Sequence, residues 1–273
     1  MATDVTEHAA AVAQTPEPKP APKQRLRPFR GRFAVVYAAL ALALGAGIAG
    51  LVVVLTESTS SSSSSSGISS SAWSGWQPEP GGESTQLSQI VKHVAPTYKL
   101  PNGDQLLTVL TKAPPSISSP SQTLPIRYVA VKGNANPDAL TSSNSVLFTM
   151  CGLGESCAIA TGKPTVNRAR LVRREALELA LYTFKYLDDV QYVVALIPPK
   201  PGVQPQFAVY FRRSDLARQL GRPLDDTLAL KTPGPNAIDT TETSTIDRLA
   251  PTYRFQVRQE QLGDIVLVLE PAV

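Results

Sequence analysis

The sequence predicts an α+β domain, with helices packed on one face of a largely antiparallel sheet, attached to a membrane by a single transmembrane helix. Residues 33–55 contain no charged side chain, and beyond residue 84 helical segments alternate with pairs of strand segments joined by short links. Such strand pairs favour antiparallel pairing over parallel crossovers. The predicted parts are a tail at 1–32, a span at 33–55, a linker at 56–83 and a domain at 84–273.

The charge-free run 33–55 is long enough to cross a bilayer, because about 20 helical residues span a hydrocarbon core of roughly 30 Å. Positive charge beside a span stays in the cytoplasm, so we expect a single-pass protein of the cell membrane with the tail inside and the domain outside. A cleaved signal peptide is the alternative, but its apolar core usually has only about 7–15 residues. The basic residues before the run are Lys19, Lys23, Arg25, Arg27, Arg30 and Arg32.

The tail and the linker have the composition of segments without a packed core. The tail is rich in Ala, Pro and Lys without apolar periodicity, which predicts disorder close to anionic lipid. The linker contains an unbroken serine run at 60–66, and a flexible coil of this length would hold the domain roughly 30 Å from the membrane. Trp73 and Trp76 interrupt it, and the sequence leaves open whether they contact the bilayer or the domain.

The charge of the predicted domain argues against nucleic-acid binding. The net charge of +4 is the sum of +3 in the tail (six basic, three acidic), −3 in the linker (three acidic) and +4 in residues 84–273 (20 basic, 16 acidic). So small an excess over 190 residues is not the basic footprint of a nucleic-acid-binding surface.

The first half of the domain begins with a helix. Leu87, Ile90, Val91 and Val94 recur at helical spacing, and Pro96 ends the pattern. A turn at Asn102-Gly103 predicts a hairpin between 98–100 and 106–110. A loop at 113–125 and strands at 126–132 and 146–150 follow.

The second half contains the longest expected helix, at 166–187, with Thr165 as its N-cap. Strands at 191–197 and 207–212 follow, and then a short helix that Ser214 caps and that Gly221 and Pro223 end. A hairpin of 253–257 with 265–269 completes the domain.

Two segments of the domain resemble each other. Residues 91–99 and 246–254 share Ala-Pro-Thr-Tyr at matching positions, and each predicts a short helix, a proline stop and a strand. Pseudo-symmetric halves, one sheet closed by both ends of the domain, and coincidence are all compatible with this repeat.

Cys151 and Cys157 predict a disulfide. A pair outside the cytoplasm is normally oxidised, and two of the five intervening residues are glycines, which lets the chain turn back on itself. A redox pair favours the C-x-x-C spacing, and a zinc site needs two more ligands, whereas His93 is the domain's only histidine. We therefore expect neither a metal nor a cofactor.

Catalytic motifs are weak in this sequence. Gly152-x-Gly154 lacks the third small residue of a dinucleotide fingerprint, and Gly162-Lys163 is followed by proline where a phosphate-binding loop needs Ser or Thr. Asp188-Asp189 and Asp225-Asp226 fall at a helix end and after a turn, where solvated acids are common. His93 has no matching partner and no G-x-S-x-G string occurs, so we expect no catalytic residue.

The strongest functional signal is a basic cluster at the start of the long helix, where positive charge opposes the helix dipole. Its two interpretations are a solvated face with Arg174 paired to Glu178, and an anion-binding face for lipid headgroups, a wall polymer or an acidic partner. The residues of this possible anion-binding face are Lys163, Arg168, Arg170, Arg173 and Arg174.

Three stretches of the chain, at 151–157, 173–182 and 210–216, resemble uncharacterised single-pass membrane proteins of high-GC Gram-positive bacteria over about half the chain. The resemblance implies an envelope location and no particular activity. We expect a non-enzymatic interaction or scaffold domain that contacts the lipid bilayer and other envelope proteins. The alternatives are a binding module for an anionic lipid or wall polymer, and an enzyme with an unrecognised site.

Overall fold

The computed structural model describes residues 73–113, 115–118, 123–260 and 264–272. The predicted tail and span lie outside these residues, as does the serine run of the linker. Within the described residues, no helix combines the length and the apolar character needed to cross a bilayer.

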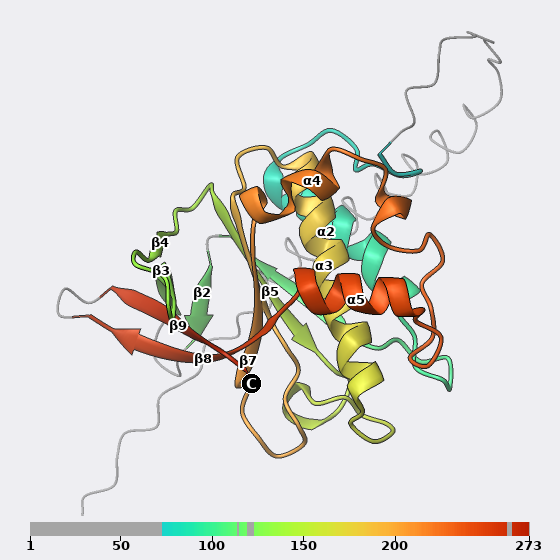
Figure 1. Ribbon diagram of the computed structural model, residues 1–273. Helices are drawn as coiled ribbons and strands as arrows, with labels where there is room; N and C mark the ends of the chain where they lie inside the picture. Colours follow the sequence, from blue (N-terminus) through green and yellow to red (C-terminus); the bar gives the residue numbers. More distant parts are fainter. Residues whose placement is uncertain (1–72, 114, 119–122, 261–263, 273) are drawn as a thin grey trace, which may run out of the picture. The chain divides into compact units, whose positions relative to one another are not determined.

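The described residues form an α+β domain around one nine-stranded sheet, as the sequence predicts (Figure 1). The strands are β1 (Thr108–Lys112), β2 (Ser116–Ser118), β3 (Thr123–Val131), β4 (Asp138–Ala139), β5 (Ser145–Cys151), β6 (Tyr192–Leu196), β7 (Phe207–Arg212), β8 (Thr252–Gln259) and β9 (Ile265–Pro271). Their order in the sheet is β1-β5-β6-β7-β8-β9-β3-β2, and β4 also pairs with β3. The helices are α2 (Glu83–Val94), α3 (Val166–Tyr186), α4 (Ala217–Leu220) and α5 (Thr240–Leu249), with 3₁₀ turns η1 (Ala95–Thr97), η2 (Glu155–Cys157), η3 (Arg213–Leu216) and η4 (Leu224–Asp226).

The sheet folds back on itself, so its central strands are buried on both faces. One face of β5, β6 and β7 packs under α2, α3 and α5, where Phe148, Val193 and Phe211 are at most 2% exposed. The opposite face packs against β3 and β9, and this second cluster includes Leu147 and Val194. In Figure 1 the helices lie on one side of β5 and β7, and β8, β9 and β3 lie on the other. Burial on both faces explains why β5 has the apolar residues Val146-Leu147-Phe148 and Met150-Cys151 in place of a strict apolar-polar alternation.

Six of the eight strand pairs that the structure describes are antiparallel. The other two are parallel, which corrects the expectation that antiparallel pairing is favoured over parallel crossovers. β5 and β6 are parallel, and α3 is the crossover that connects them. β3 and β9 are also parallel. Hairpin patterns in the sequence did not reveal these pairs, because a parallel partner is set by tertiary packing rather than by a short turn.

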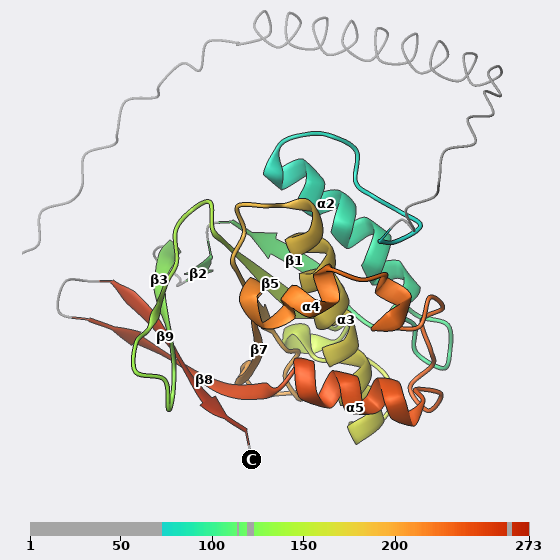
Figure 2. The same ribbon diagram turned by 45° about the horizontal axis from the view of Figure 1, so that its top comes forward.

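Helix α3 lies in the middle of the helical layer, with α2 and α5 against it (Figures 1 and 2). The predicted cap is confirmed, since the Thr165 hydroxyl accepts a hydrogen bond from the Arg168 amide at 3.1 Å. Ser214 was predicted to cap the next helix, and this is wrong. It lies inside the 3₁₀ turn η3, whose start has no side-chain cap.

The two similar segments flank α3 and then diverge. α2 runs into η1, which contains Pro96, and α5 ends two residues before Pro251. A tyrosine follows in each copy, Tyr98 and Tyr253, as expected. The hairpin after the second copy is complete, with seven paired positions between β8 and β9. The one predicted after the first copy is reduced to a single bridge, Lys99 with Gln105, because the chain beyond it pairs with β5 instead.

Trp73 and Trp76 contact the domain, which settles what the sequence left open. The Trp73 ring is 9% exposed within the helix-side core, and its indole nitrogen donates to the Gln219 carbonyl at 3.2 Å. Trp76 stacks on His93 with ring centroids 4.0 Å apart. Both rings also meet Tyr182 and Tyr186 edge-on. The packed domain therefore includes residues that sequence composition assigned to the linker.

Candidate functional site

Arg170 and Arg173, two residues of the predicted anion-binding face, share one carboxylate. Arg170 forms an ion pair with Asp247 of α5 at 3.1 Å, and Arg173 bonds the other carboxylate oxygen. Arg173 also donates to the Ala250 carbonyl at 3.2 Å. Burial tends to raise the pKa of Asp247, but the two arginines outweigh it and hold that pKa below its usual value. Their charge therefore serves the contact between α3 and α5.

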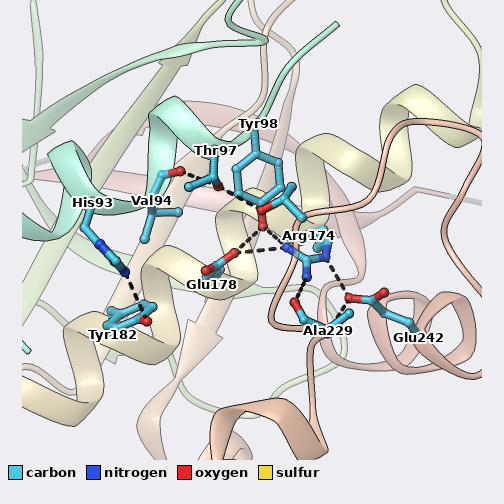
Figure 3. A network of polar contacts seen from close by, with 10 residues as sticks. His93, Val94, Thr97, Tyr98, Arg174, Glu178, Tyr182, Ala229 and Glu242 are labelled. Carbon is cyan, nitrogen blue, oxygen red and sulfur yellow. Dashed lines mark hydrogen bonds and ion pairs between the residues drawn. The ribbon is translucent and has the colours of Figure 1, made fainter. Parts of the chain in front are cut away.

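Arg174 lies in the interior, so the expectation that it belongs to an exposed face is wrong. Its side chain is 1% exposed. It donates to Glu242 at 2.7 Å, to Glu178 at 3.1 Å and to the Ala229 carbonyl at 2.7 Å (Figure 3). The predicted pair with Glu178 does form, but it is buried rather than solvated.

The surroundings of Arg174 form a closed polar network. The Tyr98 hydroxyl accepts from Arg174 and donates to Glu178, which joins the C-cap residue of η1 to α3 (Figure 3). Burial alone would lower the pKa of Arg174, but the neighbouring Tyr98, Glu178 and Glu242 raise it, so the guanidinium keeps its charge. Burial raises the pKa of Glu178, an effect that Arg174 opposes. Removing Arg174 would leave uncompensated negative charge inside the protein.

Glu175, the next residue of α3, has no such compensation. It is fully buried, and neither of its carboxylate oxygens has a hydrogen-bond partner in the part of the chain that the structure describes. Burial, together with the charge of Glu178, raises the pKa of Glu175 well above its usual value. The side chain therefore binds a proton at higher pH than an exposed glutamate does.

The remaining members of the basic cluster lie beside a pocket. Arg168 lines a cavity of about 130 Å³, and Lys200, in the loop between β6 and β7, lines it as well. Lys163 is exposed between two residues that line the cavity. Arg168 donates to the Thr161 carbonyl at 2.7 Å, which orients its guanidinium along the wall. Most of the lining is apolar: Ile159, Pro164, Ala169, Val172, Ile197, Pro198, Pro199 and Pro201.

The fold explains why these residues converge. β5, α3 and β6 form a β-α-β unit with parallel strands, and ligand sites of such units lie beyond the carboxyl ends of the strands, next to the helix N-terminus. The pocket occupies this place. Residues 159–165 connect β5 to α3, and residues 197–201 follow β6.

The disulfide predicted between Cys151 and Cys157 is confirmed, and it braces the segment that enters the pocket wall. The Gly152 amide donates to the Cys157 carbonyl and the Gly154 amide to the Ala158 carbonyl, each at 2.8 Å. A Cβ atom at Gly152 would come within 2.2 Å of that Ala158 oxygen, so only glycine fits this approach. Ile159, the next residue, lines the pocket.

The other candidates stay apart from this pocket. Asp188-Asp189 and Asp225-Asp226 are exposed. His93 is half-buried against Trp76, with its ring 3.4 Å from the Tyr182 hydroxyl, and burial lowers its pKa. No group of three His, Cys, Asp or Glu side chains in the described ranges is placed to hold a metal ion.

Sequence reasoning missed the Pro198-Pro199-Lys200-Pro201 wall. Its only available signal was a proline run with one cation directly after a predicted strand. The relevance of that run depends on β6 lying parallel to β5, which local patterns did not show.

Comparison of the chain with protein-family models, with curated proteins and with solved structures finds no match for it.

Proposed function

We propose that this chain is a membrane-tethered, extracytoplasmic and non-enzymatic binding domain, whose pocket between β6 and the start of α3 takes an anionic amphiphile such as a lipid headgroup with part of its acyl chain. The observation that carries the proposal is the pairing of an apolar cavity wall with Arg168 and Lys200. Small-molecule sites commonly combine a mostly apolar lining with a few placed polar groups.

The surroundings of the pocket support a ligand with an apolar part. Among the described residues, six large hydrophobic side chains are exposed, and three of them lie on segments that form the pocket. Leu153 is in the disulfide loop, Val166 follows the N-cap of α3, and Val203 is in the β6–β7 loop, with 58%, 67% and 40% of their surface exposed. Exposed apolar residues next to cations are typical of surfaces that meet anionic lipid.

An amphiphile fits these features better than a wall polymer. A polyanion without acyl chains would need a row of free cations, whereas Arg170 and Arg173 are bonded to Asp247 and Arg174 is buried. Lys163, Arg168 and Lys200 remain, and they border an apolar cavity.

A binding role without catalysis is supported by the location of the perturbed acids. The carboxyl groups with raised pKa values in the described residues are those of Glu83, Glu175 and Glu178. None of the three lines the pocket, whereas acid-base chemistry needs its groups within hydrogen-bond reach of the substrate.

Titration of the full chain in zwitterionic micelles with a short-chain phosphatidylglycerol tests this function. We expect saturable binding that phosphatidylcholine of equal chain length does not reproduce. Lys200→Glu should weaken binding roughly three- to tenfold, as expected for loss of one charged contact. Arg218→Glu, an equal charge change at an exposed site on α4, should leave it unchanged.

A steric variant separates the pocket from general surface charge. Ala169 lines the cavity and is itself exposed, so Ala169→Phe should fill the cavity without changing the charge. Retained phosphatidylglycerol binding by Ala169→Phe would exclude the pocket as the site. Equal binding of an acyl-free glycerol phosphate polymer would replace the lipid with a wall polymer as ligand.

A further inference from the structure

A second cavity, here called the β7–β8 cavity, lies where α5 leads into β8 beside the end of β7 (Figures 1 and 2). Its volume is about 150 Å³, and a cavity of that size can hold a molecule as small as benzene. β7 and β8 pair only from Phe207 with Arg254 to Val209 with Thr252. The residue before Thr252 is Pro251, which has no N–H to continue the ladder. The two strands therefore separate here and leave room for a small molecule.

Arg248, in the last turn of α5, is the cation that lines this cavity. Its side chain forms no ion pair or hydrogen bond with any residue that the structure describes. The neighbouring arginines differ, since Arg173 bonds Asp247 and Arg212 bonds Asp138 at 2.7 Å. Arg248 also borders a hollow along α5, whose other lining residues are threonines and a serine. Of these two places, the β7–β8 cavity is the one that combines the guanidinium with a carboxylate.

Asp215, in η3, supplies that carboxylate. Its side chain is 63% exposed, and one oxygen lies 3.8 Å from a guanidinium nitrogen of Arg212, which is too long for a hydrogen bond. Arg212 is instead bonded to Asp138 through two of its nitrogens. The other oxygen of Asp215 accepts from the Ser214 hydroxyl at 3.3 Å. Asp215 therefore keeps acceptor positions for the hydrogen-bond donors of a ligand.

We propose that the β7–β8 cavity binds a small zwitterion, a free amino acid, with its carboxylate on Arg248 and its ammonium on Asp215. Contacts of a carboxylate with a guanidinium or an ammonium are among the stronger hydrogen bonds in proteins. A plain anion would meet Asp215 and a plain cation would meet Arg248, so a ligand with both charges matches the lining. Tyr253 adds a hydroxyl to the lining. That hydroxyl has no hydrogen-bond partner in the part of the chain that the structure describes, so it can accept from the ammonium.

The cationic end of the ligand is a primary rather than a quaternary ammonium. A quaternary ammonium is recognised by the faces of aromatic rings. Tyr210 brings a ring to the lining, but the Arg212 guanidinium lies 5.3 Å from its centroid, and Tyr192 stacks on it at 6.3 Å. The Tyr210 hydroxyl donates to Asp138 at 2.9 Å. Because this ring is already engaged within the fold, the N–H donors of a primary ammonium are what Asp215 can hold.

Ligand-observed NMR of the full chain in non-ionic detergent micelles with L-alanine tests the site. We expect saturable binding. Propionate lacks the ammonium and L-alaninamide lacks the carboxylate. Each should bind at least about tenfold more weakly, because it leaves one charged residue of the cavity without a partner. Absence of saturable L-alanine binding, or equal affinity for propionate or L-alaninamide, would overturn the proposal.

Two variants assign the ends of the ligand. Arg248→Gln should weaken L-alanine binding at least about tenfold and abolish the preference over L-alaninamide, because the carboxylate loses its partner. Asp215→Asn should weaken it similarly and abolish the preference over propionate. Both residues are exposed, so the fold should tolerate these changes. An L-alanine affinity that either variant leaves unchanged would overturn the proposal.

Matched controls remove the same charges outside the cavity. Arg258→Gln on β8 and Asp225→Asn on η4, both at exposed positions, should bind L-alanine as the unaltered chain does. Equal losses in these controls would show that general surface charge, rather than the cavity, holds the amino acid. Phosphatidylglycerol binding should stay unchanged in all four variants, because no residue lines both the β7–β8 cavity and the pocket beside α3. The amino-acid site is therefore independent of the lipid-binding function proposed above.

Discussion

The Nε of Arg174 donates to Oε1 of Glu242 at 2.7 Å, although 68 residues separate them in the chain. Both side chains are nearly inaccessible, with 1% and 5% of their surface exposed. The same carboxylate oxygen accepts from the Ala229 amide at 3.1 Å, and Arg174 also bonds the Ala229 carbonyl. One arginine thereby connects α3, α5 and the loop before α5.

Replacement of Arg174 should destabilise the domain severely. Arg174→Met keeps an unbranched apolar stem but leaves Glu178 and Glu242 without their cation. We expect a loss of about 3–5 kcal/mol in the free energy of unfolding, as for other broken buried ion pairs. Denaturant unfolding followed by circular dichroism measures it. The control Arg170→Met breaks a partly exposed pair with Asp247 and should cost less than about 1 kcal/mol. Similar costs for the two variants would contradict the structural role of Arg174.

Glu175 should make the domain less stable as the pH rises. Its pKa is raised in the folded state, so folding favours the protonated form. Stability is then highest below the unfolded pKa, about 4.3, and falls as the pH passes through the raised folded pKa, with a slope of at most about 1.4 kcal/mol per pH unit.

The substitution Glu175→Gln should remove this dependence of stability on pH. The measurement is the free energy of unfolding at pH 5 and pH 8, whose difference should shrink in the variant because glutamine does not ionise. Asp226→Asn, at an exposed position on η4, should keep the wild-type difference. An unchanged difference in Glu175→Gln would mean that another group governs this pH range.

The segment that contains the two tryptophans should be required for full stability. Trp73 is 9% exposed among Tyr182 and Tyr186, and truncation of a buried aromatic costs about 3–5 kcal/mol. We expect Trp73→Ala to lower the melting temperature clearly. A chain that begins at residue 84 should melt below one that begins at residue 73. Equal melting temperatures for these two chains would show that the segment adds no stability.

Opening the disulfide should affect stability and the pocket together. For so short a ring, loss of the bond in the double variant Cys151→Ala, Cys157→Ala should cost about 2 kcal/mol. Because the braced loop leads directly into Ile159 of the pocket wall, phosphatidylglycerol binding should weaken as well. Unchanged affinity in a measurably destabilised variant would separate the disulfide from the pocket.

Most helices and strands of this domain are set by local sequence patterns, so the sequence predicts them. Helical spacing predicted α2 and α3, Thr165 marked the N-cap, and apolar runs marked β5, β6 and β7. The sequence failed where the outcome depends on distant partners. The hairpin after Asn102-Gly103 is reduced to one bridge because β1 pairs with β5 instead.

In the candidate site, too, the sequence predicts one feature and the tertiary contacts decide the rest. A cluster of arginines at the start of α3 was visible in the sequence, but its members face different directions on a helix. Arg170 and Arg173 bond Asp247, Arg174 enters the core, and Arg168 borders the pocket. Only the position of α5 beside α3 decides which charges are bonded within the fold.

The sequence by itself determined the α+β class, most of the helix and strand segments and the disulfide, because these depend on composition, periodicity and short spacing. Tertiary structure alone decided that β5 and β6 are parallel, that the sheet folds back to bury both faces of its centre, and that Arg174 is an internal cation rather than a surface one. Those outcomes arise from contacts between residues far apart in the chain, where the burial of apolar surface and the pairing of buried charge outweigh local preference.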